Sequence, residues 1–489
     1  MVAQTATPRH AHRDPSSARR QQSLEGLARI ISRGVLEELN DATGPGPANA
    51  GCGKAAGQRA TASGAKGARK AGRPAASWHL ARNVSQHAPA EDDVASFRRH
   101  TRFAQRELLW SESSLNRVTT CGRTPVTDGG VMLKKATADK AYYSGLASCG
   151  SVWACPVCSA KIRNRRAEDI SKAAANWTEE GNSVVAAAFT VPHNKGHRLA
   201  DTFAAVADSF RKIQQRKKWK KIRAELGIMG QIRAVEGTYG DHGWHPHIHA
   251  LFFCSKRRYV ASEETYVTDK GKTRTRRTYG YDVGEIDQAQ LVKLTLFLRE
   301  VWGDAIEAAG FARPSEIHGV DVQLVASAEE AGAYIAKTQD GKAVGNEVAR
   351  GDMKQGRQGS RTPFQILEDF RWTGNAADLR LWHEWEQVTH GRRAIFWSDH
   401  LRALLLPEEE EEEASDDEIA AEEVGGEDVA LIDKITWKGI TARPGLACAL
   451  LDRLESGGLD SVNELLDRHE FPPLRPFELV ETAPASLTP

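Results

Sequence analysis

Three histidines, His245, His247 and His249, stand at alternate positions of the chain, directly before the apolar run 250–253. In a β-strand, alternate side chains point to the same face of the sheet, so the three imidazoles would line up. Imidazoles spaced two apart on a rigid strand can bind one metal ion between them. The alternative is that these are ordinary strand histidines, exposed or hydrogen-bonded to neighbours.

A carboxylate, Glu236, ends the strand predicted just upstream, over 231–236. A glycine-containing turn separates it from the histidine strand, so we expect a hairpin that returns Glu236 beside the histidines on the matching face. Two imidazoles and a carboxylate suit Mn²⁺ or Zn²⁺ better than Mg²⁺. Coordination positions left open for phosphate oxygens would also suit Mg²⁺, so the choice of metal stays open. The spacing alone leaves open which two of the three histidines bind.

The chain has eight tyrosines, and Tyr334 alone lies on a clear helix, predicted over 328–337, after the histidine strand. Glu330, Tyr334 and Lys337 share one face of that helix because they are spaced four and three apart. A nearby ammonium favours the nucleophilic phenolate and can stabilise charge on a phosphate, and a carboxylate one turn away can activate water. Ser327 and Glu330 also match a capping box, which would make the glutamate structural, and a Tyr/Lys pair is commonly surface decoration.

Four cysteines lie close enough in the sequence to form one site. Cys155 and Cys158 form a Cys-x-x-Cys turn, the spacing that wraps a tetrahedral zinc ion, and Cys149 and Cys121 would complete four thiolates. A redox pair is the alternative, but no thioredoxin-like βαβ pattern surrounds the turn. The sequence therefore predicts a structural Zn²⁺ site in a reducing compartment.

Two segments combine basic side chains with aromatic rings. The first lies on a helix predicted over 199–226, and its candidate DNA-binding residues are Arg211, Lys212, Lys217, Lys218, Trp219 and Lys220. The second is the polar stretch 255–280, which we interpret as an insertion or mobile loop. Cations neutralise phosphates and rings stack on bases, so both are candidates for nucleic-acid contact, with a solvated surface as the alternative.

The order of elements between 183 and 337 is strand, helix, hairpin, helix, strand, helix, which predicts an α+β domain with a largely antiparallel sheet. The predicted organisation is a basic, disordered tail (1–90), a cysteine-rich zinc-binding module (91–175), the α+β domain (176–345), a helical extension (346–406), an acidic linker (407–428) and a small C-terminal unit of unassigned role (429–489).

Length and composition set outer limits. At 489 residues the chain is long enough for two or three folded units, and its net charge of +1 hides a basic tail and the acidic run 408–413. No apolar run is long enough to cross a bilayer and no signal peptide is visible. We therefore expect a soluble cytoplasmic protein without a membrane partner.

The pair His247 and His249 around one hydrophobic residue, followed by one tyrosine in a Tyr-x-x-Lys helix, resembles the HUH endonuclease superfamily. The longer pattern is similar to the plasmid rolling-circle replication initiators of Gram-positive bacteria, whose three motifs are matched in order by 189–193, 236–253 and 330–337. The segment 149–158 resembles the cysteine-rich segment of actinobacterial members. In mobilisation relaxases the tyrosine usually precedes the histidines, whereas here it follows them.

The resemblance implies an antiparallel-sheet HUH nuclease domain that uses a divalent metal, Mg²⁺ or Mn²⁺. His247 and His249, with Glu236 as a third ligand, would hold the metal. His245 departs from the family pattern and keeps the choice of ligands open. His247 and His249 are favoured because Pro246 is a poor hydrophobic residue for a strand interior.

In that family Tyr334 would attack a phosphate in single-stranded or extruded origin DNA, leaving a 5′-phosphotyrosine link and a 3′-OH primer, and Lys337 would assist the developing charge. Glu330 occupies the position of a glutamate that activates water to end replication. The implied partners are plasmid origin DNA, a host helicase and the replication machinery. The alternative functions are a single-tyrosine transposase of the same superfamily and a zinc-containing DNA-binding regulator without catalysis.

Overall fold

The computed structural model describes residues 91–136, 140–268, 270–316, 318–335, 360–407, 413–423 and 425–477. The predicted tail 1–90 lies outside these residues, as does 336–359 after the tyrosine helix. The side chains of 91–95, 329 and 333–335 also lie outside the described part. Within it, every helix is too short or too polar to span a bilayer.

The centre of the fold is a five-stranded sheet in which each pair of neighbouring strands is antiparallel. The strand order is β8 (Val320–Leu324), β3 (Ser183–Thr190), β5 (Gly243–Cys254), β4 (Gly230–Gly240) and β9 (Ile395–Trp397). The α+β class with an antiparallel sheet is therefore confirmed. The edge strand β9 comes from the segment predicted as a helical extension, so the predicted boundary at 345 cuts through this sheet.

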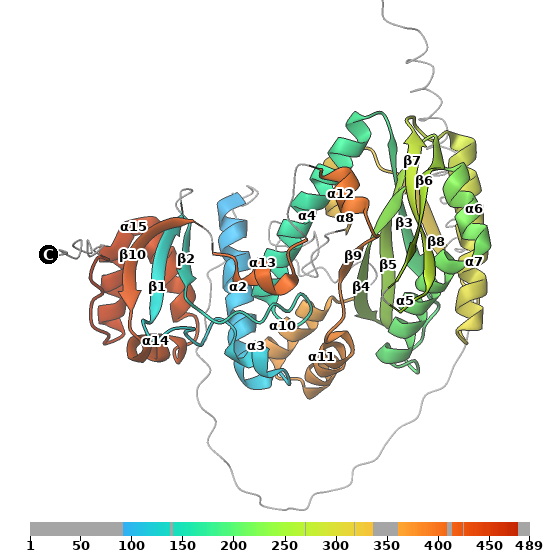
Figure 1. The fold of residues 1–489 in the computed structure, drawn as a ribbon. Coiled ribbons are helices and arrows are strands. Elements are labelled where there is room, and N and C mark those ends of the chain that lie inside the picture. The colour runs from blue at the N-terminus through green and yellow to red at the C-terminus, as the bar shows by residue number, and fades with distance from the viewer. Residues whose placement is uncertain are drawn as a thin grey trace, which may run out of the picture. The chain divides into compact units, whose positions relative to one another are not determined.

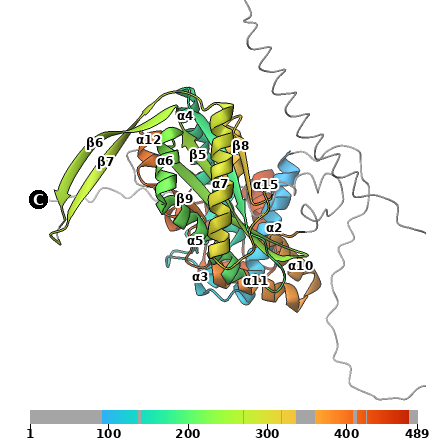
Figure 2. The same ribbon diagram turned by 90° about the vertical axis from the view of Figure 1, so that its right-hand side faces the viewer.

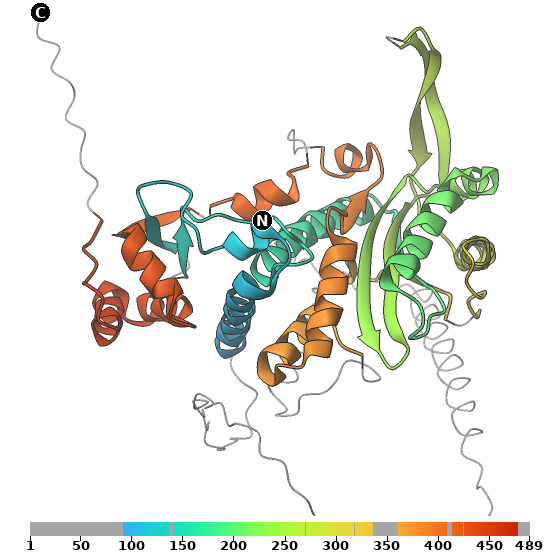
Figure 3. The ribbon, with the colours of Figure 1, turned by 90° about the horizontal axis from the view of Figure 1, so that it is seen from below.

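Helices cover both faces of the sheet (Figures 1 and 3). One layer consists of α5 (Leu199–Gln215), α6 (Lys217–Glu225) and α7 (Gln288–Ala308), and the other includes α4 (Pro156–Glu179) and α8 (Ala328–Ile335). Neighbouring residues of β5 contact different layers, because strand side chains alternate between faces. Phe252 contacts Trp219 of α6, with ring centroids 5.7 Å apart, whereas Phe253 contacts Trp177 of α4 at 6.4 Å.

Further helices extend the core beyond the sheet. They are α2 (Glu91–Glu112), α3 (Asn116–Thr120), α10 (Pro363–Thr373), α11 (Ala376–Thr389) and α12 (Leu401–Leu405). α10 packs against α2 and α11, and α12 packs against α4. One continuous hydrophobic core joins these helices to the sheet, and Trp177, Trp219, Trp302 and Trp385 are fully buried in it.

The C-terminal segment completes a second, three-stranded sheet. Its order is β10 (Gly426–Ile432), β1 (Val131–Ala136) and β2 (Ala141–Ser144), and it packs with α14 (Lys434–Thr441) and α15 (Leu446–Arg468) around a separate core. Val131 pairs with Ile432, and both are fully buried. The predicted separation of 91–175 from 429–489 therefore does not hold, because each segment supplies strands of the same sheet.

The described part of the predicted acidic linker is folded onto the molecule. It contains α13 (Asp416–Ala421), which packs against α4 and buries Ile419. The guanidinium of Arg166 in α4 pairs with Glu413 at 2.7 Å and with Asp416 at 3.2 Å. Acidic side chains of this stretch thus neutralise the buried Arg166 of α4, so the stretch is packed against the molecule and is more than a solvated linker.

The stretch predicted as a mobile loop forms a regular ribbon instead. β6 (Arg257–Val267) and β7 (Thr273–Asp282) pair antiparallel as a two-stranded sheet of their own. Threonine and tyrosine, which favour strands, recur along both segments, and Gly271 in the connecting turn has a φ of 69° that suits glycine. Figures 2 and 3 show this ribbon extending away from the helices and the central sheet.

Candidate functional site

The β4–β5 hairpin brings a carboxylate and two imidazoles together. Glu236 pairs directly with His247 across the hairpin, so their side chains share one face of the sheet, and His249 is the next residue on that face. Oε2 of Glu236 lies 3.5 Å from Nε2 of His247 and 3.4 Å from Nε2 of His249. One ligand atom of each of the three residues lies within 4.8 Å of the others. Such a group has the dimensions of a metal site.

The orientation of these side chains suits a cation. Nδ1 of His247 donates a hydrogen bond to the backbone carbonyl of His245 at 3.2 Å, so Nε2 is the ring nitrogen that faces Glu236. Oε1 of Glu236 is buried and has no hydrogen-bond partner in the described part of the chain. Burial alone would raise the pKa of Glu236, but contacts with His247 and His249 lower it well below its ordinary value. The residue is therefore a carboxylate with one oxygen to spare.

His245 does not join this group. Its ring stacks on that of His193, with centroids 4.6 Å apart and planes 18° apart. Burial, with His247 and His193 nearby, lowers the pKa of His245 to about 3, so its imidazole is neutral. The three histidines therefore divide into a pair beside Glu236 and a third that stacks elsewhere. His193 is not among the predicted site residues, although its position at the end of the motif 189–193 was a signal that could have identified it.

The helix α8 contains two of the three predicted catalytic residues. The Oε2 of Glu330 accepts a hydrogen bond from the backbone N–H of Ala326 at 2.8 Å, and its own N–H donates to Ser327 Oγ at 3.1 Å. Glu330 thus closes the start of the helix, as the capping alternative expects, and it is also exposed. Tyr334 lies in α8 with its side chain outside the described part, and Lys337 lies outside the described residues.

A glycine sets the close approach of α8 to α4. A Cβ atom at Gly332 would lie 2.0 Å from Ser171 Oγ and 2.8 Å from the carbonyl oxygen of Ala167, both in α4. Ala331 beside it is fully buried. By helical spacing this packed side of α8 is opposite the side on which Glu330 lies. The contact therefore fixes which way the helix is turned.

The metal-sized cluster and α8 belong to the same side of the central sheet. In β5 the odd-numbered residues His247, His249 and Phe253 share a face, and Phe253 contacts Trp177 of α4. α8 packs on α4 and also lies near β3, β4 and β5. The helix that carries Tyr334 therefore covers the face on which the two imidazoles and the carboxylate meet.

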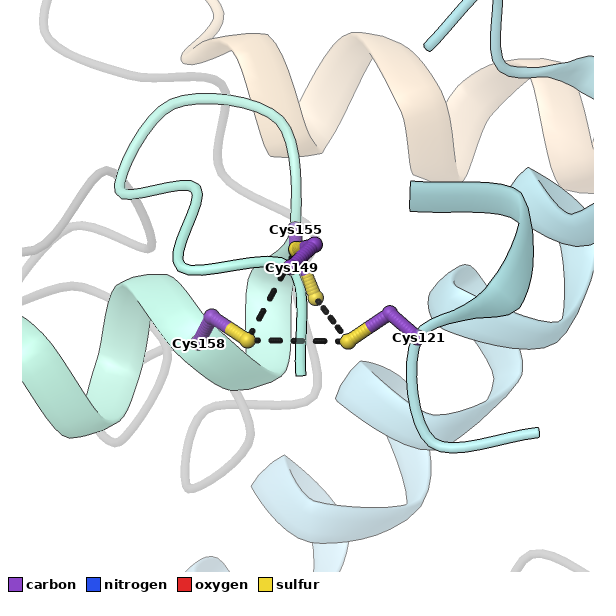
Figure 4. A group of neighbouring side chains, drawn as sticks. All are labelled: Cys121, Cys149, Cys155 and Cys158. Atoms are coloured by element: carbon purple, nitrogen blue, oxygen red, sulfur yellow. Dashed lines mark hydrogen bonds between the residues drawn. The ribbon is translucent and has the colours of Figure 1, made fainter. Parts of the chain in front are cut away.

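A second cluster consists of four buried cysteines (Figure 4). Cys121 Sγ lies 3.7 Å from Cys155 Sγ and 3.6 Å from Cys158 Sγ, and Cys149 Sγ lies 3.7 Å from Cys158 Sγ. Four thiolates on a tetrahedral zinc ion, each at about 2.3 Å, lie about 3.8 Å from one another. Contacts with the three other thiols lower the pKa of Cys158 well below its ordinary value. These three sulfur–sulfur distances match those expected for a tetrahedral zinc site.

The helix α4 joins the cysteine cluster to α8. Cys155 is its N-cap residue and Cys158 lies in its first turn, whereas Ala167 and Ser171 further along it contact Gly332 of α8. The cysteine cluster therefore holds the first turn of the helix on which α8 rests.

The predicted DNA-binding residues of α5 and α6 lie on the other side of the sheet. Trp219 is buried between Phe252 and Phe297, so its ring is a core side chain and cannot stack on a base. Arg211 pairs with Asp208 at 2.9 Å and Lys218 with Glu300 at 3.0 Å. Lys212, Lys217 and Lys220 are exposed. These basic residues therefore lie on the opposite side of the sheet from the metal-sized cluster, and their role in DNA binding stays a prediction.

Comparisons with known proteins agree with the motifs. Residues 147–274 match a family model described as "Replication protein", a segment that includes the histidine strand and ends before α8. Protein rep of Streptomyces lividans is 32% identical over 322 residues, which cover 56% of this chain and 67% of that protein. A protein named Neomycin resistance protein, from Streptomyces cyanogenus, is 32% identical over 159 residues, 27% of this chain and 36% of that protein. No solved structure gave a significant match.

Proposed function

The chain belongs to the Rep family of plasmid replication initiators, and we propose that it starts rolling-circle replication by cutting one strand of origin DNA with Tyr334. The observation that carries this proposal is the position of α8 over the sheet face where Glu236, His247 and His249 meet. A helix that bears a single nucleophile then faces a site that can bind a divalent cation. The other partners that this function implies are a host helicase and the replication machinery.

The metal centre of the proposal consists of His247, His249 and Glu236, with Mg²⁺ or Mn²⁺ as the ion. Three protein ligands on one side leave coordination positions open for phosphate oxygens, and the spare buried oxygen of Glu236 supports this assignment. When bound, the cation would polarise the scissile phosphate. His245 has no place in this set, because its ring stacks on His193.

The chemical step is a transesterification. The phenolate oxygen of Tyr334 attacks the phosphorus, a new P–O bond joins the 5′ side of the DNA to the tyrosine, and the bond from phosphorus to the 3′ oxygen breaks. The leaving 3′ oxygen takes up a proton and becomes the primer hydroxyl. Lys337 would stabilise the charge that develops on the phosphate. One phosphodiester bond is exchanged for another of similar energy, so the reaction can later run in reverse and rejoin the strand.

A direct test is to incubate the full chain with supercoiled plasmid that carries its origin, with Mg²⁺ or Mn²⁺ and without metal. We expect nicked circles and a covalent protein–DNA adduct only when metal is present, and mass spectrometry should locate the linked nucleotide on Tyr334. Origin binding without cleavage would instead identify a DNA-binding regulator. A linkage to a different tyrosine would refute the assigned nucleophile.

Glu330 can be tested for two separate roles, because it caps α8 and also lies one turn before Tyr334. Glu330→Gln keeps an oxygen that can accept from the N–H of Ala326 but removes the base. We expect normal nicking and about 100-fold slower hydrolysis of the adduct, measured in single-turnover assays. Glu330→Ala should add a loss of about 1 kcal/mol in the free energy of unfolding. If Glu330→Gln hydrolyses the adduct at the wild-type rate, the role of Glu330 is purely structural.

We also propose that Cys121, Cys149, Cys155 and Cys158 hold a structural Zn²⁺ ion. The support is the agreement between their sulfur–sulfur distances and tetrahedral geometry, together with their complete enclosure in the core. The ion would contribute to folding and take no part in the chemical step, because all four coordination positions are filled by protein.

Cys158→Ala should therefore abolish zinc binding and reduce the soluble yield. Structural zinc in small peptides binds with about 10–16 kcal/mol at neutral pH, as much as the whole stability of a typical domain. Cys254→Ala is the matched control, because Cys254 is equally buried but lies outside the cluster. Metal analysis should find one zinc per chain in the wild type and the control. Full zinc content in Cys158→Ala would refute the site.

A further inference from the structure

Most of the β6–β7 ribbon extends away from the rest of the described chain, although β6 contacts α6. Residues 259–267 and 270–279 are all exposed, and Thr268 near the turn is half-buried. An isolated two-stranded hairpin is only marginally stable in water. Tyr259, Tyr266 and Val267 nonetheless expose 42%, 43% and 67% of their surfaces. A ribbon of this length without a packed face points to a partner.

The base of the ribbon is firmly anchored. Tyr281 packs its ring on Trp177 of α4, with centroids 4.8 Å apart, and its hydroxyl donates to Glu180 at 2.7 Å. The N–H of Gly284 donates to the side chain of Asn182. Arg258 lies over the ring of Tyr279 at 3.6 Å. The ribbon therefore leaves the molecule in a defined direction and does not swing freely at its root.

The charge of the ribbon is strongly positive. Residues 256–282 contain eight lysines and arginines and four acidic residues, a net charge of +4. One acidic residue, Glu263, is neutralised by Arg277 at 2.6 Å on one face of the ribbon. On the other face Arg274 lies directly across from Tyr266, and Arg276 lies directly across from Glu264, the acidic residue on that face. Within the described part of the chain neither Arg274 nor Arg276 makes a side-chain ion pair or hydrogen bond.

We propose that the β6–β7 ribbon is a DNA-binding arm whose face with Tyr259, Tyr266, Arg274 and Arg276 lies along duplex DNA beside the nick site. The ribbon is basic, so its partner is anionic, and a two-stranded β-ribbon fits the major groove of B-DNA. β6 has 11 residues, a length of about 36 Å, close to the rise of about 34 Å for one turn of duplex. The arm is therefore about as long as one turn of duplex DNA.

The arm also lies in the right place for this role, which rests on the nuclease function proposed above. β6 follows β5 directly, and Cys254 at the end of β5 is about 17 Å along the strand from His249. A duplex held by the arm would thus adjoin DNA whose strand enters the metal centre. The basic residues of α5 and α6 project from the layer that covers the opposite face of the sheet, so the arm replaces them as the duplex contact.

The test compares two double variants of the full chain with the same change of charge. Arg274→Glu with Arg276→Glu alters the arm, and Lys217→Glu with Lys220→Glu alters α6. The probes are a fluorescent duplex of mixed sequence, about 30 base pairs or three turns long, and the matching single strand. We expect the arm variant to bind duplex at least about tenfold more weakly, with a plot of log affinity against log salt that is shallower by about 2.

The α6 variant should bind duplex within about twofold of the wild type, and both variants should keep the wild-type melting temperature because all four residues are exposed. Undiminished duplex binding by the arm variant, or an equal loss in both variants, would overturn the proposal. A changed elution volume in gel filtration with normal DNA binding would show that the arm joins copies of the chain instead. Because the readout is binding, an arm that binds DNA in a chain that cuts nothing would refute only the nuclease.

Discussion

Tyr334→Phe should reduce nicking of origin DNA by about 1000-fold or more, because it removes the attacking oxygen and keeps the ring. No neighbouring group can replace that oxygen in forming a link to the 5′ phosphate. The variant should bind the origin and its metal as the wild type does, since neither task uses the hydroxyl. Nicked circles separated on gels and covalent adduct counted after denaturation would measure the loss.

Tyr239→Phe provides the matched control. It removes a hydroxyl from another tyrosine of the same domain, whose ring packs on Trp244 with centroids 5.3 Å apart, a contact that phenylalanine keeps. We expect its nicking rate to stay within about twofold of the wild type. Residual adduct in Tyr334→Phe at wild-type levels would show that the nucleophile lies elsewhere in the chain and would remove the central element of the mechanism.

The second large effect is expected at the histidines, where a pair of variants separates a ligand from its neighbour. His249→Ala should weaken Mn²⁺ binding by at least about 100-fold and abolish nicking at micromolar metal, because one of three protein ligands is lost. His245→Ala should keep the metal affinity within a few-fold, since His245 stacks on His193 and stays outside the Glu236 cluster. Titration calorimetry with Mn²⁺ reports both affinities directly.

High metal should partly restore nicking to His249→Ala if the residue acts only as a ligand. Equal losses of affinity in the two variants would mean that all three histidines share the ion, and a loss confined to His245→Ala would reassign the centre to the His193 side. Each result identifies a different set of ligands, so the experiment decides which of the three imidazoles bind.

Local periodicity was enough to predict the hairpin that forms the candidate metal centre. The alternation of His245, His247 and His249 and the turn after Glu236 fix both the face and the register of β4 and β5, and these depend only on neighbouring residues. The cysteine cluster could also be predicted from the sequence, because three of its members lie within one short segment and zinc restricts the spacing of its ligands.

Other features depend on contacts between distant segments and were not accessible from local patterns. Trp219 lies in a run of lysines that looks like a DNA-binding surface, but its ring fills the space between Phe252 and Phe297. The stretch around Ile419 is rich in acidic residues, as a linker would be, yet it neutralises Arg166 of α4. The strand β9 is three residues long, too short to stand out among the helices that flank it.

The pairing of β1 with β10 has a consequence for biosynthesis. Val131 must wait for Ile432 to be translated before the smaller core can close, a delay of roughly 15 seconds to a minute at ordinary ribosomal rates. During that interval β1 has an open edge and uncovered apolar side chains, the features that lead nascent polypeptides to aggregate or to recruit chaperones. Messages that stop early would therefore yield products with a bare strand, and slow codons upstream of β10 should lower the yield of native protein.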